Sequence, residues 1–208
     1  MPFIVEANPD VVLLSGYFRI LPDFFLEQFP DTKNTHCMDL SWIAQREQKD
    51  SPLVRYRQLR YVGGQDPNAV AQLEDVERAF KGESAVFDLL QSARIIRPHP
   101  KLRATVHRAI PEYDEGLIEV QSAPVEVDWD LAQRLGRTRN WGELMKYADL
   151  LQGELKVKGD IPATITAIEL TSDGRLDHHD GAVYVDDIRM PVHGLRLDKW
   201  EDPKRVET

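Results

Sequence analysis

The chain has 208 residues, enough for one domain with a substantial core, and its 42% hydrophobic and 29% charged residues are typical of a soluble protein. A formal net charge of −9 argues against a general nucleic-acid binder, because no basic surplus is present to neutralise phosphates. The single cysteine, Cys37, excludes an intrachain disulfide framework, and no apolar run approaches the roughly 18 residues of a membrane span, so we expect a cytoplasmic protein.

The first elements alternate between strand and helix. The segment DVVLLSG (10–16) is a continuous apolar run that ends at a glycine, which predicts a strand buried on both faces. The helix DFFLEQF (23–29) follows a proline, with its three phenylalanines available for a buried side. A second strand then carries Asn34 and His36. This order of strand, helix and strand predicts an α/β fold.

Asn34 and His36 stand two residues apart in that second strand, so their side chains share one face. An amide that donates hydrogen bonds and an imidazole that carries a proton near neutral pH are thereby directed at the same place. Such a pair is suited to stabilising an oxyanion and supplying a proton. The alternative interpretation is a turn or cap residue beside a surface histidine.

The middle of the chain is harder to assign. Residues 43–83 are rich in Arg, Gln, Asp and Glu and contain a Gly-Gly turn, and we interpret them as an excursion from the sheet. This excursion would be a lid or an arm for a partner chain. Residues 84–93 predict a helix with Ser84 as its N-cap.

The second half contains strands, a long helical stretch and a hairpin. Residues 103–110 and 117–127 alternate as strands do, with the turn PEYDEG between them. Residues 128–155 have helical periodicity. Residues 163–170 stay open, because Thr and Ile favour a strand whereas the preceding DIP favours a helix start. The tail RLDHHDGAVYVDDIRMP predicts a hairpin that turns at Asp180–Gly181.

Four stretches, taken in order, resemble the folate-dependent formyltransferase family, most closely its phosphoribosylglycinamide branch. DVVLLSGYFRIL (10–21) is similar to the family's strand and folate-binding loop, and NTH (34–36) is similar to its Asn-x-His motif. ATVHRAIPEYDEG (104–116) is similar to the strand and loop that deliver the family's catalytic aspartate. SDGRLDHHDGAVYVDDIRMP (172–191) resembles the closing hairpin of the glycinamide branch.

The resemblance covers most of residues 10–42 and 81–194 and implies one formyltransferase-like α/β domain over residues 1–208. We expect an open, mostly parallel twisted sheet with flanking helices and a C-terminal hairpin, interrupted by the excursion at about 43–83. Family members begin with a βαβ half whose Gly-rich loop cradles the substrate phosphate. This chain starts at the strand before the folate loop, so we expect self-association or a second chain that completes the sheet.

The same resemblance implies a catalytic group of Asn34, His36 and Asp114. Asn34 would donate a hydrogen bond to the oxyanion that forms when an amine attacks the formyl carbon of 10-formyltetrahydrofolate. His36 would stabilise the oxyanion and pass a proton to the leaving nitrogen, while Asp114 would hold His36 and raise its pKa. The folate co-substrate would contact Phe18, Arg19, Ile20, Leu21, Asn34, Ile110, Pro111, Glu112 and Tyr113.

One segment departs from the family pattern. The Asn-x-His motif is normally followed by Pro-Ser-Leu-Leu-Pro, whereas this chain has Cys37–Ser41 (CMDLS). The change affects the acceptor site more than the folate site, and Asp39 would repel a phosphate. Cys37 is interpreted as a structural cysteine, because formyl transfer from folate needs no covalent intermediate.

Other polar groups receive structural interpretations. The run Asp177–Asp180 (DHHD) suggests a metal site, but neighbouring strand residues face opposite ways, so three ligands do not converge and we expect no metal. The arginines within residues 55–60 are interpreted as a solvated face in preference to an anion-binding patch. We assign no role to His99 or His107.

The leading function hypothesis is formyl transfer from 10-formyltetrahydrofolate to a primary amine, with glycinamide ribonucleotide of purine biosynthesis as the first candidate acceptor. A formyltransferase for another amine, such as an amino sugar, is suggested by the departure at Cys37–Ser41. A non-catalytic relative that binds folate or serves as an interaction subunit is the alternative from a different class. It is suggested by the missing phosphate loop.

Overall fold

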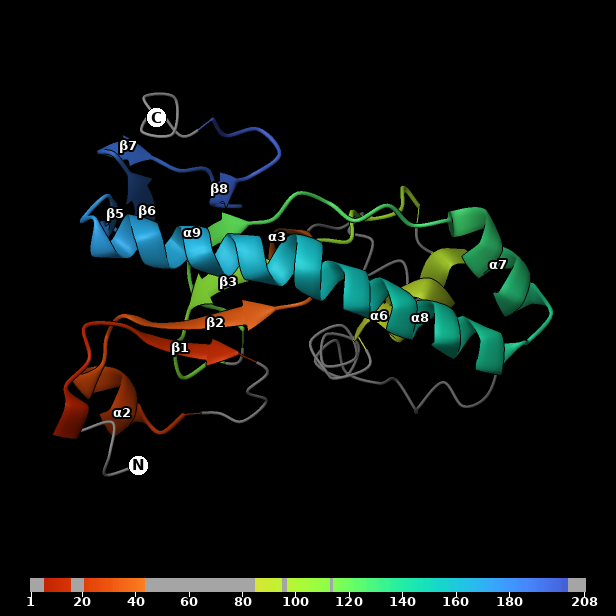
Figure 1. Ribbon diagram of the computed structural model, residues 1–208, viewed down its shortest axis with the longest axis horizontal. Coiled ribbons are helices and arrows are strands. Elements are labelled where there is room, and N and C mark those ends of the chain that lie inside the picture. Colours follow the sequence, from red (N-terminus) through yellow and green to blue (C-terminus); the bar gives the residue numbers. More distant parts are fainter. Residues whose placement is uncertain (1–5, 16–20, 44–84, 95–96, 113, 202–208) are drawn as a thin grey trace, which may run out of the picture.

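The computed structural model describes residues 6–15, 21–43, 85–94, 97–112 and 114–201 (Figure 1). Within these ranges, no helix is both long enough and apolar enough to cross a membrane. The excursion predicted over residues 43–83 and the N-cap predicted at Ser84 lie outside the described residues, except for Ile43. The predictions for Phe18, Arg19, Ile20 and Tyr113 lie outside them too.

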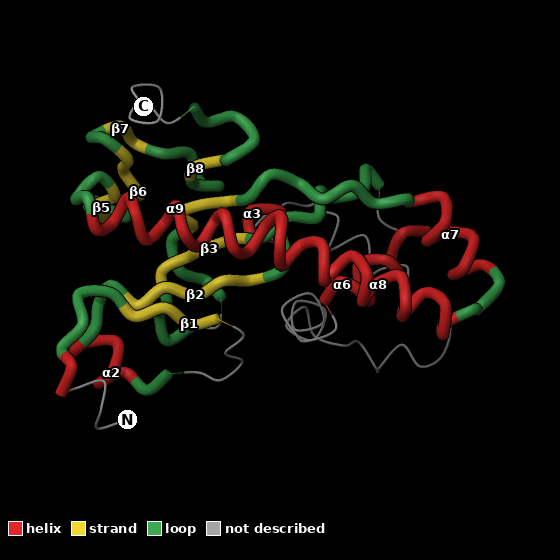
Figure 2. Tube along the Cα trace, viewed as in Figure 1, coloured by secondary structure: helices red, strands yellow, loops and turns green. Residues whose placement is uncertain are grey.

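The main sheet has five strands in the order β1 (Val12–Ser15), β2 (Thr32–His36), β3 (Thr105–Arg108), β4 (Ile118–Gln121) and β8 (Leu195–Arg196). β1 pairs with β2 in parallel, β3 is antiparallel to both of its neighbours, and β4 pairs with β8 in parallel. Four of the five strands therefore run in one direction. The predicted α/β fold with an open, mostly parallel sheet and flanking helices is confirmed (Figure 2).

The apolar run at β1 does not form a strand buried on both faces, as the sequence suggested. Val12 and Leu14 are each partly exposed, because β1 is the edge strand of the described sheet. Both side chains pack against α2 (Asp23–Gln28), whose buried side is formed by Phe25 and the following Phe29. The third phenylalanine, Phe24, was expected to be available for burial and is instead 65% exposed. Among the described strands β1 pairs only with β2, and the prediction that a second chain completes the sheet stays a prediction.

A helical layer lies beyond the ends of β1 and β2 (Figure 1). The stretch predicted as helical over 128–155 forms two helices, because Arg139 between them adopts a left-handed backbone with φ of 53°. The side chain of Asp128 caps the first helix and that of Asn140 caps the second. The helices of this layer are α3 (Leu40–Ile43), α6 (Ala85–Gln91), η2 (Ser92–Arg94), α7 (Trp129–Arg137) and α8 (Trp141–Leu155).

Helix α8 continues through η3 (Lys156–Asp160) into α9 (Ile161–Ser172), which lies across the sheet (Figure 1). The segment left open at 163–170 is therefore helical, although its Thr and Ile residues favour strands. Burial against the sheet outweighs that local preference. η3 is a single π turn, which rotates the following residues by about a quarter turn relative to a regular helix. The rotation keeps the buried sides of α8 and α9 aligned, so that α8 packs on the core beneath the helical layer and α9 packs on the core between the sheet and the hairpin.

The C-terminal hairpin forms a second sheet of three strands, β5 (Leu176–His179), β6 (Ala182–Val185) and β7 (Ile188–Arg189). The turn predicted at Asp180–Gly181 is confirmed, and these residues have φ of 52° and 68°. Aspartate tolerates this left-handed region better than most residues, and glycine enters it without steric cost. The hairpin packs with α9 on the main sheet through a shared core that includes Val106, Val120 and Leu176.

A buried ionic group joins the main sheet to the hairpin. Lys33 on β2 lies on the face opposite to Asn34, and its ammonium donates to Glu119 Oε1 on β4 at 2.8 Å. His178 Nε2 on β5 lies 3.0 Å from the same oxygen. Burial raises the pKa of Glu119, but hydrogen bonds from His178 and Lys33 outweigh it and hold that pKa below its usual range.

Candidate active site

The structure brings together the three residues predicted to be catalytic. Asn34 and His36 share one face of β2, and Asp114 reaches that face from the loop after β3. Asn34 Nδ2 donates to Asp114 Oδ1 at 3.1 Å, and His36 Nε2 lies 3.5 Å from Asp114 Oδ2. The Asn34 amide has two hydrogens and uses one for Asp114, so the second is available for a developing negative charge.

His107 is a fourth member of this cluster and was not predicted from sequence. It lies opposite Asn34 in the pairing of β2 with β3, and its Nε2 is 3.2 Å from Asp114 Oδ1. Its Nδ1 is 3.0 Å from the carbonyl oxygen of Arg108, which fixes the ring. The sequence signal was the two-residue spacing of Thr105 and His107, which puts both side chains on one face of β3. Because Thr105 pairs with His36, this is the face that carries the cluster. That signal becomes useful only once the register is known.

The loop after β3 is shaped to deliver Asp114. The pairing of β3 with β4 shifts at Val106 and His107, so the strand end is irregular just before the loop. Asp114 itself has φ of 53°, a conformation that aspartate tolerates. Gly116 allows the chain to return against β3, because a Cβ at this position would lie 1.7 Å from the carbonyl oxygen of Arg108.

The cluster is shielded from solvent. His36, His107 and Asp114 are 5%, 2% and 9% exposed, so two imidazoles share one carboxylate in a largely dry environment. Electrostatic interactions are stronger there than in water. Such a group holds both imidazoles in fixed orientations, because each ring also has its Nδ1 engaged: that of His36 accepts from the Met38 amide at 3.2 Å, and that of His107 lies 3.0 Å from the Arg108 carbonyl oxygen.

Cys37, directly after His36, lies in an environment that disfavours the thiolate. Burial, with a further contribution from the negative charges of Asp160 and Asp114, raises the pKa of its thiol to about 12. The thiolate is the reactive form, so the thiol is inert at neutral pH. The interpretation of Cys37 as a structural cysteine agrees with this environment.

Asp160 is a second residue that sequence reasoning missed, since it was treated only as part of a helix start. It lies in the π turn η3, and π turns inside α-helices are frequent at functional sites. Burial raises the pKa of its carboxyl to about 6, although Lys156 acts in the opposite direction. Its Oδ1 is buried and accepts no hydrogen bond from the described residues. No pattern in the sequence distinguishes this aspartate from a helix cap.

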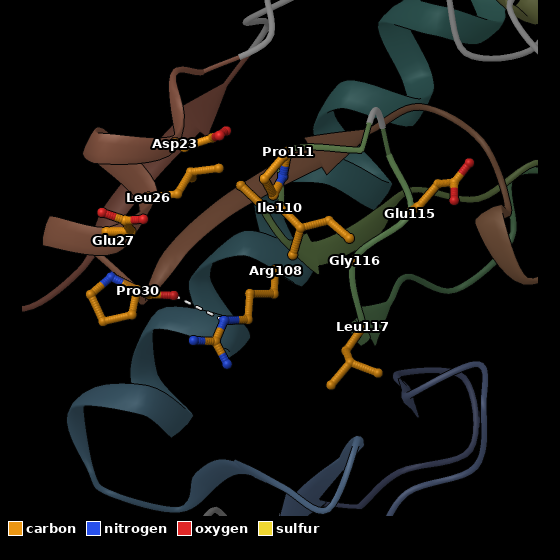
Figure 3. A pocket seen from close by; sticks show the side chains of 11 residues that line it. Asp23, Leu26, Glu27, Pro30, Arg108, Ile110, Pro111, Glu115, Gly116 and Leu117 are labelled. Atoms are coloured by element: carbon orange, nitrogen blue, oxygen red, sulfur yellow. Dashed lines mark hydrogen bonds between the residues drawn. The ribbon is translucent and has the colours of Figure 1, made fainter.

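A cavity of about 620 Å³ lies between α2 and the loop that carries Asp114 (Figure 3). Leu26, Ile110 and Leu117 supply apolar wall, while Asp23 and Glu27 place carboxylates along α2. The remaining lining residues include Pro30, Arg108, Ala109, Pro111, Glu115 and Gly116.

Only some of the residues predicted to contact folate line this cavity. Ile110 and Pro111 line it, whereas Leu21 is buried in the core beneath α2 and Glu112 is exposed without lining the cavity. Asn34 belongs to the cluster around Asp114. The cavity and the cluster are joined by one loop, because Ile110, Pro111 and Asp114 all belong to it.

Asp39, in the segment Cys37–Ser41 that differs from the formyltransferase pattern, interacts with side chains and backbone groups of this fold. Asp39 accepts hydrogen bonds from Gln121 Nε2 at 2.7 Å and from the Trp42 amide at 3.2 Å. Arg103 Nε lies 3.6 Å from Asp39 Oδ2. The carboxylate is therefore neutralised within the fold, which weakens the repulsion of a phosphate expected from the sequence.

The histidines of the hairpin are used separately. His178 faces the buried Glu119, while His179 stacks on Tyr184 with ring centroids 3.7 Å apart. Among the described residues, no group of three side chains is arranged to hold a metal ion. His99 stacks on Trp129 at 4.2 Å between ring centroids, which is a packing contact.

No protein-family model matches the sequence, and no curated protein matches it. The chain is similar in structure to phosphoribosylglycinamide formyltransferase of Coxiella burnetii, with 15% identity, a TM-score of 0.42, and coverage of 94% of this chain and 64% of the other. It is similar to glycinamide ribonucleotide transformylase 1 of Symbiobacterium toebii, with 19% identity, a TM-score of 0.43, and coverage of 88% and 59%.

A third similar structure is phosphoribosylglycinamide formyltransferase of Anaplasma phagocytophilum, with 17% identity and a TM-score of 0.44. The match covers 88% of this chain and 62% of that one. The chain thus spans less than two thirds of the length of each of these three proteins.

Proposed function

We propose that this protein transfers a formyl group from 10-formyltetrahydrofolate to a primary amine. The observation that carries the proposal is the convergence of Asn34, His36 and Asp114 within hydrogen-bonding or ion-pair distance. These residue types are the ones that acyl transfer from a folate nitrogen requires: an oxyanion donor, a proton carrier and a carboxylate to orient it.

Each member of the group has one task. Asn34 donates its second amide hydrogen to the oxyanion that forms when the amine attacks the formyl carbon. His36 Nδ1, which accepts a hydrogen bond from the Met38 amide at 3.2 Å, would take one proton from the attacking amine in place of that bond and pass it to the folate nitrogen, so the new C–N bond forms and the old one breaks without net change in the histidine. Asp114 keeps the His36 ring oriented and balances its charge while it holds the extra proton.

The cavity beside α2 fits the ring system of the folate co-substrate. A pterin is flat and presents amino and ring N–H donors at one edge. Leu26 and Ile110 offer apolar contact with its faces, and the carboxylates of Asp23 and Glu27 offer acceptors for its donors. The volume of about 620 Å³ lies within the range of small-molecule pockets. The loop from Ile110 to Asp114 would then join the ring site to the reacting carbon.

The acceptor would be held by groups near Cys37. Asp160 has a buried oxygen without a partner among the described residues, and its charge reaches the Cys37 thiol. A buried acceptor oxygen of this kind suits an ammonium or a hydroxyl donor. Glycinamide ribonucleotide is the first candidate acceptor, and an amino sugar is the second.

The test is formyl transfer to glycinamide ribonucleotide and to a set of amino sugars, using the wild type, His36→Ala, Asp114→Asn and the control His179→Ala. We expect the first two variants to lose about 10²–10⁴-fold in kcat, because each removes acid–base or orienting function. The control alters a half-exposed, stacked histidine and should retain activity.

Three outcomes separate the alternatives. Turnover with an amino sugar alone would reassign the acceptor. Tetrahydrofolate binding by titration calorimetry, without turnover of any amine, would favour a non-catalytic folate-binding subunit. Equal activity in His36→Ala and wild type would refute the catalytic role of this cluster.

A further inference from the structure

Two successive side chains of β4 lie on the same side of the main sheet. Val120 packs in the core between the sheet and the hairpin, and the carboxylate of Glu119 reaches His178 of that hairpin. The next residue toward the loop, Ile118, packs in the other core, beneath the helical layer. Because the side chains of a regular strand alternate between faces, β4 contains one inserted residue at this point.

The strand pairing locates the inserted residue at Glu119. Val106 of β3 pairs with Val120, but the next residue of β3, His107, pairs with Ile118. Glu119 is therefore skipped in the pairing of β3 with β4. A β-bulge of this kind turns a side chain to the face that it would not reach in a regular strand.

The bulge also sets the length of the loop that carries Asp114. The Arg108 amide donates to the carbonyl oxygen of Leu117 at 3.0 Å. Without the bulge, Ile118 would lie opposite Arg108, and the loop would be one residue longer. Leu117 would then take the place of Gly116, where a Cβ would lie 1.7 Å from the Arg108 carbonyl oxygen. The loop in its observed form therefore requires the bulged register.

A buried ion pair holds Glu119 in its bulged orientation. Lys33 and Glu119 are both 0% exposed, and the Lys33 ammonium donates to Glu119 Oε1 at 2.8 Å. His178 Nε2 lies 3.0 Å from the same oxygen. Since Lys33 is on β2 and Glu119 is on β4, the pair crosses beneath β3 and connects two strands whose axes are about 9.5 Å apart.

The physical value of this pair lies in the arrangement that it selects. A buried ion pair adds little stability over apolar residues of similar size, because desolvation offsets the attraction. Its best-supported role is to specify one register among several. A slip of β4 by one residue would turn Glu119 to the opposite face of the sheet and leave the Lys33 ammonium buried without its carboxylate. Two apolar side chains would impose no such penalty on the slipped register.

We propose that the Lys33–Glu119 pair fixes the register of β4, and that through the bulge it sets the loop that delivers Asp114 to Asn34. Lys33 and Glu119 are thus positioning residues that act from the face of the sheet opposite to the cluster. Their effect on catalysis rests on the proposed formyl transfer, whereas their effect on the register does not.

The register is tested by NMR on the double variant Lys33→Met, Glu119→Leu. This variant should fold, because apolar replacement of a whole buried pair is often neutral for stability. In the wild type we expect cross-strand backbone contacts of His107 with Ile118 alone. In the double variant His107 should pair with residue 119 in part of the molecules, seen as a second set of signals for residues 109–118. Glu119→Gln keeps an acceptor oxygen for Lys33 and should retain the wild-type register.

The position of Asp114 is followed in the same spectra and in the kinetics. The contact between the Asn34 side-chain amide and Asp114 should weaken in the double variant, and kcat should fall about 10-fold or more with less than about a threefold change in KM. Leu151→Ala is the matched control, because Leu151 is buried in the other core and its truncation lowers stability without touching the bulge. It should keep a single register and the wild-type kcat.

Two outcomes would overturn the proposal. The first is a double variant that keeps the single bulged register, with Asp114 still in contact with Asn34. The second is an equal loss of register in Leu151→Ala, which would show that the register follows general stability. A wild-type chain that transfers no formyl group would refute the proposed function, and the NMR contacts would still decide whether the ion pair sets the register.

Discussion

Asn34 and His107 lie opposite one another on β2 and β3, and both reach the same oxygen of Asp114, Asn34 Nδ2 at 3.1 Å and His107 Nε2 at 3.2 Å. Asp114 is therefore held from two strands while its other oxygen faces His36 at 3.5 Å. The carboxylate is the organising centre of the cluster. Its position depends on both strands, so neither strand can shift without moving the proposed catalytic group.

His107 should act as a positioning residue through Asp114. We expect His107→Leu to lower kcat about 10- to 100-fold with little change in the KM for either substrate. His107→Gln places an N–H donor near the position of Nε2 and should recover part of the loss. A purely structural role would instead lower stability in both variants and leave the pH profile of the remaining activity unchanged. Steady-state kinetics across pH distinguishes the two.

The cavity beside α2 should control folate binding. Leu26→Trp fills it and should raise the KM for the formyl donor about tenfold or more, with a smaller effect on kcat. Phe24→Ala is the matched control, because Phe24 is on the same helix, is 65% exposed and does not line the cavity. Equal donor affinity in the two variants would place the folate elsewhere.

Asp160 should lower stability as pH rises. Burial raises its folded-state pKa to about 6 from 3.8, so the folded chain binds the proton more tightly than the unfolded chain between these values. Stability therefore falls as pH rises through this window. Asp160→Asn should remove the fall and gain about 1–2 kcal/mol at pH 8, after allowance for solvent screening. Urea unfolding at pH 5 and pH 8 measures it, with the exposed Asp149→Asn as control.

Cys37 should react slowly with alkylating reagents while the chain is folded. A thiol with a pKa of about 12 instead of 9.0 contains about a thousandfold less thiolate at pH 8. Iodoacetamide labelling followed by mass spectrometry should therefore be far slower in the native protein than in urea. Rapid native labelling would mean that the thiol is neither buried nor surrounded by negative charge.

The buried Lys33–Glu119 pair should be costly to break from one side. Lys33→Met leaves Glu119 with one fewer partner in an apolar environment and should destabilise the fold by about 3–5 kcal/mol. The double variant Lys33→Met, Glu119→Leu should cost less than Lys33→Met alone. Lys158→Met, which removes an exposed pair with Glu154, should change stability by less than about 1 kcal/mol. Chemical denaturation of all three gives the comparison.

Local rules were enough to predict several features from sequence. The alternation of strand side chains places Asn34 and His36 on one face, and the Asp180–Gly181 turn follows from the backbone freedom of these two residues. Helical periodicity located α6, α7 and α8, although the break at Arg139 was missed. These features depend on interactions between residues close in the chain, which the order of amino acids determines directly.

Other features were decided by tertiary structure. Asp114 meets Asn34 from 80 positions away, and His107 joins them only through the register of β2 with β3. Asp160 is half-buried, with one carboxylate oxygen shielded, because it lies in the π turn where the two packed halves of the helix meet. Val12 and Leu14 are partly exposed because no described strand flanks the outer side of β1. Each outcome depends on which distant segments pack together. Burial and strand pairing across the whole fold decide this, and local sequence patterns do not reveal it.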